Sequence, residues 1–322
     1  MGPTVVVLGF AEDPPPRLDA AERLATVRFA STEEDLREAL LQSQATVVFA
    51  WDYEPWLLSS VWDSAGELRW IQTASAGVDR LLFPELIESD VVVTNARGVF
   101  EEPMAEYVLG LIIAFAKDFP TTVRDTEAKR WNHRDTERVA GKRLLVVGPG
   151  PIGHAAGGAA KSLGMEVEAV GRTSRPADEP FSRIYGRTEL LEALSGADYV
   201  LDAAPLTEET RHMFDERAFR AMKPSACFLN VGRGATVDTD ALVGALNEGG
   251  IAGAVLDVFE DEPLPNEHPL WDASNVIVSP HMSGDIAGWE IAVADVFLDN
   301  LQRFVEGRPL RNFVDKERGH GA

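Results

Sequence analysis

Cysteine and long apolar runs are the first things missing from this sequence. Its 322 residues include one cysteine, Cys227, which excludes an intrachain disulfide framework and is typical of a reducing compartment. The longest apolar stretch, residues 107–116, is far short of the roughly 20 residues that a membrane-spanning helix needs. The N-terminus lacks the basic segment that opens a signal peptide. We therefore expect a cytoplasmic protein with no membrane partner, in which Cys227 is a buried strand residue.

Lysine is scarce, and positive charge is outnumbered. Only six of the 30 basic residues are lysine, and 52 Asp and Glu residues give a formal net charge of -22. Such a surface argues against nucleic acid as a partner, because nucleic acid binds positively charged surfaces. It favours a halophilic protein, kept soluble in concentrated salt where exposed charges are screened. An acidic protein of an ordinary cytosol is the alternative interpretation.

Short β-rich runs alternate with helical patterns along most of the chain, which predicts parallel strands in an α/β layer fold. A capping box at Ser31 and Glu34 predicts the start of a helix that ends near Leu41. A long helix with an apolar second half is expected over residues 101–117, and a further helix over 291–304 that packs back on the first domain. Strands are expected at residues 5–8, 27–30, 46–50, 70–73, 91–94, 144–147, 166–170 and 227–229.

A glycine motif follows the predicted strand at residues 144–147. It reads Gly148-Pro149-Gly150-Pro151-Ile152-Gly153 and opens a helical segment. In that context the first glycine makes a tight turn, the second lets the backbone approach a pyrophosphate, and the third allows close helix packing. The motif predicts a dinucleotide site, with a ligand-free turn as the alternative.

The next strand ends in Gly171-Arg172-Thr173-Ser174-Arg175, where an NAD site usually has an acidic residue for the ribose 2′-hydroxyl. Guanidinium and hydroxyl groups bind a 2′-phosphate, whereas a carboxylate repels one. We therefore predict a preference for NADPH and NADP+ through Arg172, Thr173 and Ser174, with Arg175 as a further candidate. NADH and NAD+ are the alternative cofactor, and a loop without a ligand is the alternative interpretation.

Three charged residues follow predicted strand ends further along the chain. Arg233 lies between two glycines, Glu262 lies in an acidic, proline-rich segment, and His281 follows Pro280. Loops beyond the carboxyl ends of parallel strands are where α/β sheets bind ligands. One such residue would mean little, but three in a domain that begins with a dinucleotide motif predict an active site.

With these motifs the sequence resembles the D-specific 2-hydroxyacid dehydrogenase family. The first hundred residues match it less specifically, mainly at residues 75–79, and the acidic, lysine-poor composition suggests a haloarchaeal member. The other matching segments are residues 148–153, 205–207 with Thr210, 230–234, 256–265, 268–271 and 280–281.

The resemblance implies a catalytic group of Arg233, Glu262 and His281. His281, with an ordinary pKa near ~6.5, would exchange the proton of the substrate oxygen during hydride transfer, and Glu262 would orient it. Arg233 would hold the substrate carboxylate, together with the backbone of a loop at Ser75, Ala76 and Gly77 that is otherwise a simple turn. The resemblance also places Pro205, Thr210, Val231, Gly232, Asp257 and His281 at the cofactor.

The family also implies two Rossmann-like domains with parallel sheets. We expect a discontinuous substrate domain over residues 1–98 and 288–322 and a dinucleotide-binding domain over 99–287, with hinge closure between them. A homodimer built on the cofactor domains is implied, through the apolar helix around residues 107–116. The expected reaction is reversible reduction of a small 2-oxo acid to a D-2-hydroxy acid.

Other functions within and beyond the family fit the sequence to different degrees. A formate dehydrogenase is disfavoured because that branch has Gln where this chain has Glu262. A phosphoglycerate dehydrogenase of the long type is disfavoured because 322 residues leave no room for its regulatory domain. A glyoxylate/hydroxypyruvate reductase is an alternative function within the family. A dinucleotide-sensing binding protein that resembles the family's corepressors is an alternative of a different class. The six histidines show no metal-ligand spacing, so no metal site is expected.

Overall fold

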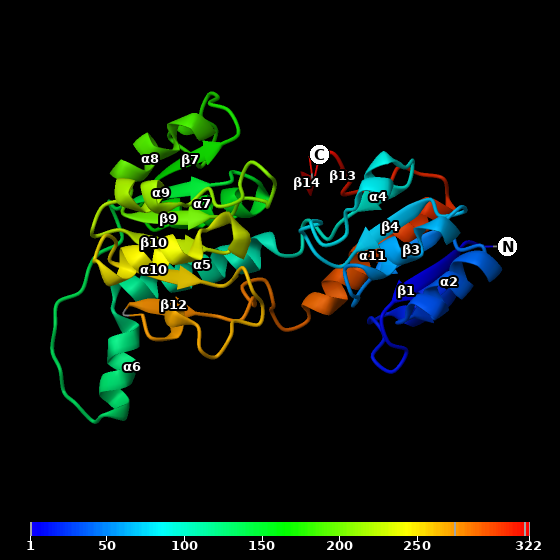
Figure 1. Cartoon of the computed structure of the whole chain (residues 1–322), viewed down its shortest axis with the longest axis horizontal. Coiled ribbons are helices and arrows are strands. Elements are labelled where there is room, and N and C mark those ends of the chain that lie inside the picture. The colour runs from blue at the N-terminus through cyan, green and yellow to red at the C-terminus, as the bar shows by residue number, and fades with distance from the viewer. Residues whose placement is uncertain (1, 274, 319, 322) are drawn as a thin grey trace. The chain divides into compact units, whose positions relative to one another are not determined.

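The computed structural model describes residues 2–273, 275–318, 320 and 321 (Figure 1). The chain forms two compact units, Met1–Phe100 with Ile286–Ala322, and Glu101–Asp285. These junctions lie close to the expected ones at 98/99 and 287/288. The predicted fold class is confirmed, because each unit is built on a parallel sheet flanked by helices.

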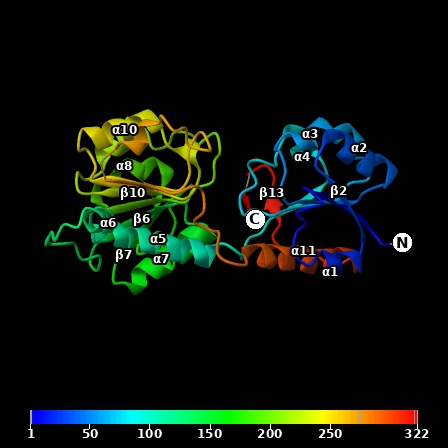
Figure 2. The ribbon, with the colours of Figure 1, turned by 90° about the horizontal axis from the view of Figure 1, so that it is seen from below.

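The first unit has a five-stranded parallel sheet in the order β2-β1-β3-β4-β5. One face is covered by α1 (Leu18–Glu22) and α11 (Trp289–Val305), and the other by α2 (Glu33–Gln42), α3 (Leu57–Ser60) and α4 (Pro84–Glu88) (Figure 2). Both faces are therefore buried, which explains the valine-rich strands. The strands are β1 (Thr4–Leu8), β2 (Thr26–Ala30), β3 (Val47–Ala50), β4 (Trp70–Thr73) and β5 (Val92–Thr94).

The C-terminal helix returns to this unit as predicted. Val293, Phe297 and Leu301 of α11 are buried against β1, β3 and β4, and the ring of Phe297 stacks on that of Phe49 at 4.1 Å. A short antiparallel pair that the sequence pattern did not indicate follows, β13 (Val314–Asp315) with β14 (His320–Gly321).

The predicted capping box is off by one residue. The N-cap of α2 is Thr32, not Ser31, and its hydroxyl oxygen accepts from the Asp35 amide at 3.2 Å. Because consecutive Ser and Thr residues both precede acidic residues, the pattern allowed two registers. Docking of Leu36 and Leu40 into the sheet selects the second register.

The second unit has a seven-stranded parallel sheet in the order β12-β11-β10-β9-β6-β7-β8. Helices α5 (Glu101–Ala116) and α7 (Pro151–Ser162) cover one face, and α8 (Leu190–Gly196), α9 (Glu216–Ala221) and α10 (Thr239–Asn247) cover the other (Figure 2). Cys227 is fully buried in β10, as predicted. The strands are β6 (Arg143–Val147), β7 (Glu166–Gly171), β8 (Ile184–Gly186), β9 (Tyr199–Asp202), β10 (Cys227–Asn230), β11 (Gly253–Leu256) and β12 (Val276–Val278).

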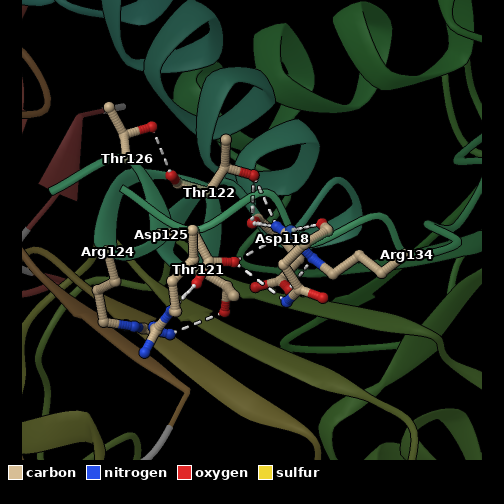
Figure 3. A network of polar contacts seen from close by, with 9 residues as sticks. Asp118, Thr121, Thr122, Arg124, Asp125, Thr126 and Arg134 are labelled. Atoms are coloured by element: carbon tan, nitrogen blue, oxygen red, sulfur yellow. Dashed lines mark hydrogen bonds and ion pairs between the residues drawn. The ribbon is translucent and has the colours of Figure 1, made fainter. Parts of the chain in front are cut away.

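Between α5 and β6 the structure adds α6 (Phe119–Glu127), which the sequence analysis did not predict. A polar network holds the following loop against it (Figure 3). Arg134 donates to the Asp118 carboxylate at 2.7 Å and to the Thr122 hydroxyl at 2.6 Å. Asp125, itself buried, accepts from Arg130 at 2.9 Å and Asn132 at 3.1 Å. Hydrogen bonds and ion pairs, rather than an apolar face, hold α6 in place, so hydrophobic periodicity did not predict this helix.

None of the helices in the described part of the chain combines the length and apolarity needed to span a bilayer.

Candidate active site

The glycine loop between β6 and α7 has the shape that a dinucleotide requires. Gly148 has φ +96°, and a Cβ there would lie 2.6 Å from the Ala203 carbonyl oxygen. A Cβ on Gly153 would lie 2.2 Å from the Gly148 carbonyl oxygen, whereas nothing lies within 4 Å of a Cβ on Gly150. The first and third positions therefore need glycine, and the second borders open space. This arrangement fits a pyrophosphate beside the backbone.

The amides of α7 provide the binding groups of this loop. Gly150 is the N-cap, and its carbonyl accepts the His154 amide at 2.8 Å. The Ile152 and Gly153 amides precede that first bond, and Pro151 has no amide to satisfy. The positive end of a twelve-residue helix is thus open to an anion.

The loop after β7 carries the predicted 2′-phosphate residues. Arg172, Thr173 and Ser174 are exposed directly after Gly171, the last residue of the strand. Arg175 pairs with Asp178 at 3.3 Å, so its charge is partly neutralised. A Cβ on Gly171 would lie 3.5 Å from Pro149 Cγ, an ordinary contact, so the end of β7 adjoins the glycine loop.

Two further predicted cofactor residues lie at the end of β9. Pro205 is exposed, and its carbonyl accepts from the Thr210 hydroxyl at 2.7 Å. Thr210 also accepts from the Thr207 amide at 2.8 Å. Thr210 therefore shapes the turn that presents Pro205, while Val231 is buried after β10.

The structure brings the three predicted catalytic residues to one edge of the second sheet. Arg233 follows β10, Glu262 lies in the loop after β11, and His281 follows β12. His281 Nδ1 and Glu262 Oε2 are 2.8 Å apart, and Glu262 Oε1 accepts from the Phe259 amide at 3.0 Å. The carboxylate is thus fixed on one oxygen by backbone and on the other by the imidazole.

Hydrogen bonds and nearby charges shift the pKa values of both His281 and Glu262. The pKa of His281 is raised by its hydrogen bond to Glu262 and by the charge of that carboxylate, against burial and the charge of Arg233. Burial raises the pKa of Glu262, but hydrogen bonds from His281 and the Phe259 amide, with the charges of His281 and Arg233, outweigh it and lower the pKa. The favoured state is therefore imidazolium with carboxylate.

The turn that carries Arg233 is wedged between neighbouring loops. A Cβ on Gly234 would lie 1.8 Å from the carbonyl carbon of Phe259, and one on Gly232 would lie 2.8 Å from the Ala204 carbonyl oxygen. Asn230, which the sequence analysis did not assign a role, donates to the Arg233 carbonyl at 3.0 Å and accepts from the Gly232 amide at 2.9 Å. An Asn two residues before a Gly is a turn signal that points to this clamp.

Asp257 holds the loop of His281. Its fully buried carboxylate accepts from the Ser279 hydroxyl at 2.7 Å and from the amides of Met282 and Ser283 at 2.9 Å each. The His281 amide donates to the Asp257 carbonyl at 2.8 Å, and His281 has φ 50°, a left-handed conformation uncommon outside glycine. The place of Asp257 at the cofactor, which the family resemblance implies, stays a prediction.

The predicted substrate loop lies in the first unit, directly after β4. The carbonyls of Ser75 and Ala76 are taken by the Ala96 amide at 3.0 Å and the Asn95 side chain at 2.7 Å. Within the described residues the amides of Ala76 and Gly77 donate to no acceptor. This backbone therefore has donors to offer an anion.

Among the described residues, no group of three or more His, Cys, Asp or Glu side chains is arranged to hold a metal ion.

Comparisons with known proteins point to one family. Residues 109–283 match the family described as D-isomer specific 2-hydroxyacid dehydrogenase, NAD binding domain. The glyoxylate reductase of Thermococcus gammatolerans is 35% identical over 267 residues, which cover 80% of this chain and 79% of the relative. A D-isomer specific 2-hydroxyacid dehydrogenase from Xanthobacter autotrophicus, solved in complex with NADPH and MES, is 31% identical with a TM-score of 0.80, covering 98% of this chain and 99% of that one.

The fold and site, with these matches, define an NAD(P)-dependent oxidoreductase that acts on the CH–OH group of hydroxy acids. The chain belongs to the D-isomer specific 2-hydroxyacid dehydrogenase family. The predicted family is thereby confirmed, whereas a haloarchaeal source stays a prediction.

Replacement of Gly153 by Ala should abolish dinucleotide binding, because the added methyl meets the Gly148 carbonyl oxygen at 2.2 Å. Gly158→Ala on the same helix is the matched control, since nothing lies within 4 Å of its Cβ, and it should stabilise the fold by up to ~1 kcal/mol. NADPH fluorescence titration and thermal melts measure both effects. Unchanged affinity in Gly153→Ala would contradict the proposed shape of the loop.

Proposed function

We propose that this protein is a cytoplasmic NADPH-preferring reductase that converts small 2-oxo acids to D-2-hydroxy acids, reversibly and by hydride transfer. The observation that carries the proposal is the His281–Glu262 pair at 2.8 Å beside the turn of Arg233. Glyoxylate or hydroxypyruvate is the alternative substrate, favoured by relatives named glyoxylate reductase in Thermococcus gammatolerans and Thermococcus litoralis.

The residues divide the chemistry between them. NADPH, when bound through the glycine loop and the residues after β7, supplies the hydride. His281, with Nδ1 engaged by Glu262, has Nε2 left to give a proton to the substrate oxygen in reduction and to take it back in oxidation. The Arg233 guanidinium binds the substrate carboxylate as a planar fork and polarises the carbonyl. The free amides of Ala76 and Gly77 provide further donors for the carboxylate.

His281→Ala should lower turnover by at least ~100-fold with little effect on NADPH affinity, because its main loss is the proton donor. Arg233→Ala should damage both turnover and the KM of the oxo acid. Near-normal turnover in either variant would remove that residue from the mechanism. The direct assay pairs NADPH and NADH with glyoxylate, pyruvate and longer 2-oxo acids.

Reduction needs the imidazolium, so kcat/KM should fall as pH rises through the raised pKa of His281. Glu262→Gln removes the carboxylate that raises this pKa, and the fall should therefore move to lower pH. Steady-state rates across a pH series measure the shift. A profile that stays in place would show that another group supplies the proton.

The double variant Gly171→Asp/Arg172→Gln should shift the preference from NADPH towards NADH, because a carboxylate repels the 2′-phosphate and accepts from a 2′-hydroxyl. A Cβ on Gly171 makes only ordinary contacts, 3.5 Å at the nearest, so the change tests charge rather than folding. The ratio of kcat/KM for the two cofactors is the readout. Arg175→Gln, which removes a cation paired with Asp178, should change it less.

We propose a homodimer formed through α5. Its apolar residues Leu109, Leu111 and Ile113 are only partly buried in this chain, although α5 packs against α7. Nothing lies within 4 Å of a Cβ on Gly110, so Gly110→Arg is harmless to one chain and obstructs a second. Sedimentation should show monomers for this variant. Gly244→Arg on α10, also in open space, is the control that should stay dimeric.

We propose that the net charge of -22 reflects a saline environment. Removal of salt should lower both the melting temperature and the rate with anionic substrate, because self-repulsion and repulsion of the substrate are then unscreened. Melts and rates across a KCl series from dilute to multimolar measure this. Full stability and activity in dilute buffer would remove the halophilic assignment without affecting the dehydrogenase.

A further inference from the structure

Asp202, the last residue of β9, is fully buried and is not explained by the reaction. One carboxyl oxygen accepts from the Ala204 amide at 3.0 Å, and the other lies in hydrogen-bond contact with the Thr236 hydroxyl. In the described part of the chain no cation pairs with Asp202. The same Thr236 hydroxyl lies 2.6 Å from the carbonyl oxygen of Arg233.

The protons of this chain can be counted. A hydroxyl has one proton to donate, yet Thr236 Oγ1 faces two oxygens at hydrogen-bond distance. If Asp202 were ionised, both would be acceptors, and one contact would set lone pairs against each other. If the carboxyl carries a proton, both contacts become hydrogen bonds. Asp202 then donates to Thr236, and Thr236 donates to the Arg233 carbonyl.

We propose that Asp202 is a positioning residue for Arg233, acting as a neutral carboxylic acid through Thr236 on the backbone of the turn that carries the guanidinium. The proposal rests on the proposed reductase function for its catalytic consequence, but not for the protonation of Asp202. The Asn230 side chain donates to the same carbonyl at 3.0 Å, so the backbone of Arg233 is held by side chains from β9, through Thr236, and from β10.

The surroundings of the carboxyl support the neutral state. Its partners in the sheet are Val147 on β6 and Asn230 on β10. Within the described residues, the hydrogen-bond partners of the carboxyl are the Thr236 hydroxyl and the Ala204 amide, and no charged side chain contributes to its pKa. Burial raises the pKa of Asp202 to about 7, against the hydrogen bonds from Thr236 and the Ala204 amide. Because the acid is the competent form, the chain of hydrogen bonds is intact below this pKa and is lost above it.

Stability gives a test that needs no enzyme activity. Asp202→Asn mimics the neutral acid, since its amide donates to Thr236 and its oxygen accepts from Ala204. An unfolded Asp ionises near pH ~4, so the wild type should lose stability relative to the variant as pH rises from there to about 7. Melts of the full chain in KCl should show Asp202→Asn gaining several degrees on wild type between pH 4.5 and 8. A difference independent of pH, or one of opposite sign, would overturn the neutral state.

Thr236 tests the link to Arg233. Thr236→Val should lower kcat/KM for the oxo acid by roughly tenfold, as expected for one lost hydrogen bond, and leave the KM of NADPH unchanged. Thr236→Ser keeps the hydroxyl and should restore the rate. In Asp202→Asn the alkaline fall in kcat/KM should retain one ionisation, that of His281, where the wild type shows two. A wild-type rate in Thr236→Val, or the same two ionisations in Asp202→Asn, would overturn the positioning role.

Binding of oxamate, an unreactive 2-oxo acid analogue, separates this proposal from the proposed function. Calorimetry should show about tenfold weaker oxamate binding in Thr236→Val than in Thr236→Ser, whether or not the chain turns over any substrate. If no variant reduces 2-oxo acids but this difference persists, the reductase assignment fails and the role of Asp202 stands. Equal oxamate affinities would refute the role itself.

Discussion

The parallel hydrogen-bonded register of the second sheet is the constraint on which the site depends. Asp202 pairs with Asn230, Asn230 with Leu256, and Leu256 with Val278, so the ends of β9, β10, β11 and β12 are aligned to the residue. The loops beyond these ends must then share one edge, whatever their separation along the chain. Arg233, Glu262 and His281 come from three such loops. A slip of one residue in any strand would turn its side chains to the other face and separate the groups.

Buried acids organise this edge. Asp257 gathers the loop of His281 through one hydroxyl and two amides, and Asp202 reaches the turn of Arg233 through Thr236. Backbone amides and neighbouring hydroxyl groups form hydrogen bonds with both carboxyls. Under the proposed function, Arg233 binds the substrate carboxylate and Arg172 the cofactor. Lys316 has a structural role. Its ammonium group donates to the carbonyls of Leu86, Ser89 and Val91 and so holds the C-terminal segment against the first unit.

Local sequence patterns anticipated much of the fold. The strands of the first sheet, several strands of the second and the return of α11 followed from buried-type runs and apolar spacing, because those signals act within a few residues. Strands β8 and β9 were not predicted. The capping box failed by one residue, since Ser31 and Thr32 offer equal local chemistry and the docking of α2 decides between them. Helix α6 was missed because ion pairs between Asp125, Arg130 and Arg134 replace an apolar face. Such pairs form only after the loop folds back.

The sequence by itself determined the class of the protein and the identity of the chemical groups. The glycine motif could be interpreted from the sequence alone, because each required glycine is explained by contacts within its own turn and with the adjoining strands. Tertiary structure alone decided how the groups act on one another. His281 contacts Glu262 at 2.8 Å although the two residues are 19 positions apart in the sequence. Thr236 contacts Asp202, from which it is separated by 34 positions, and this contact is what requires the proton on Asp202. Their pKa shifts follow from burial and distance in space, which spacing along the chain does not encode.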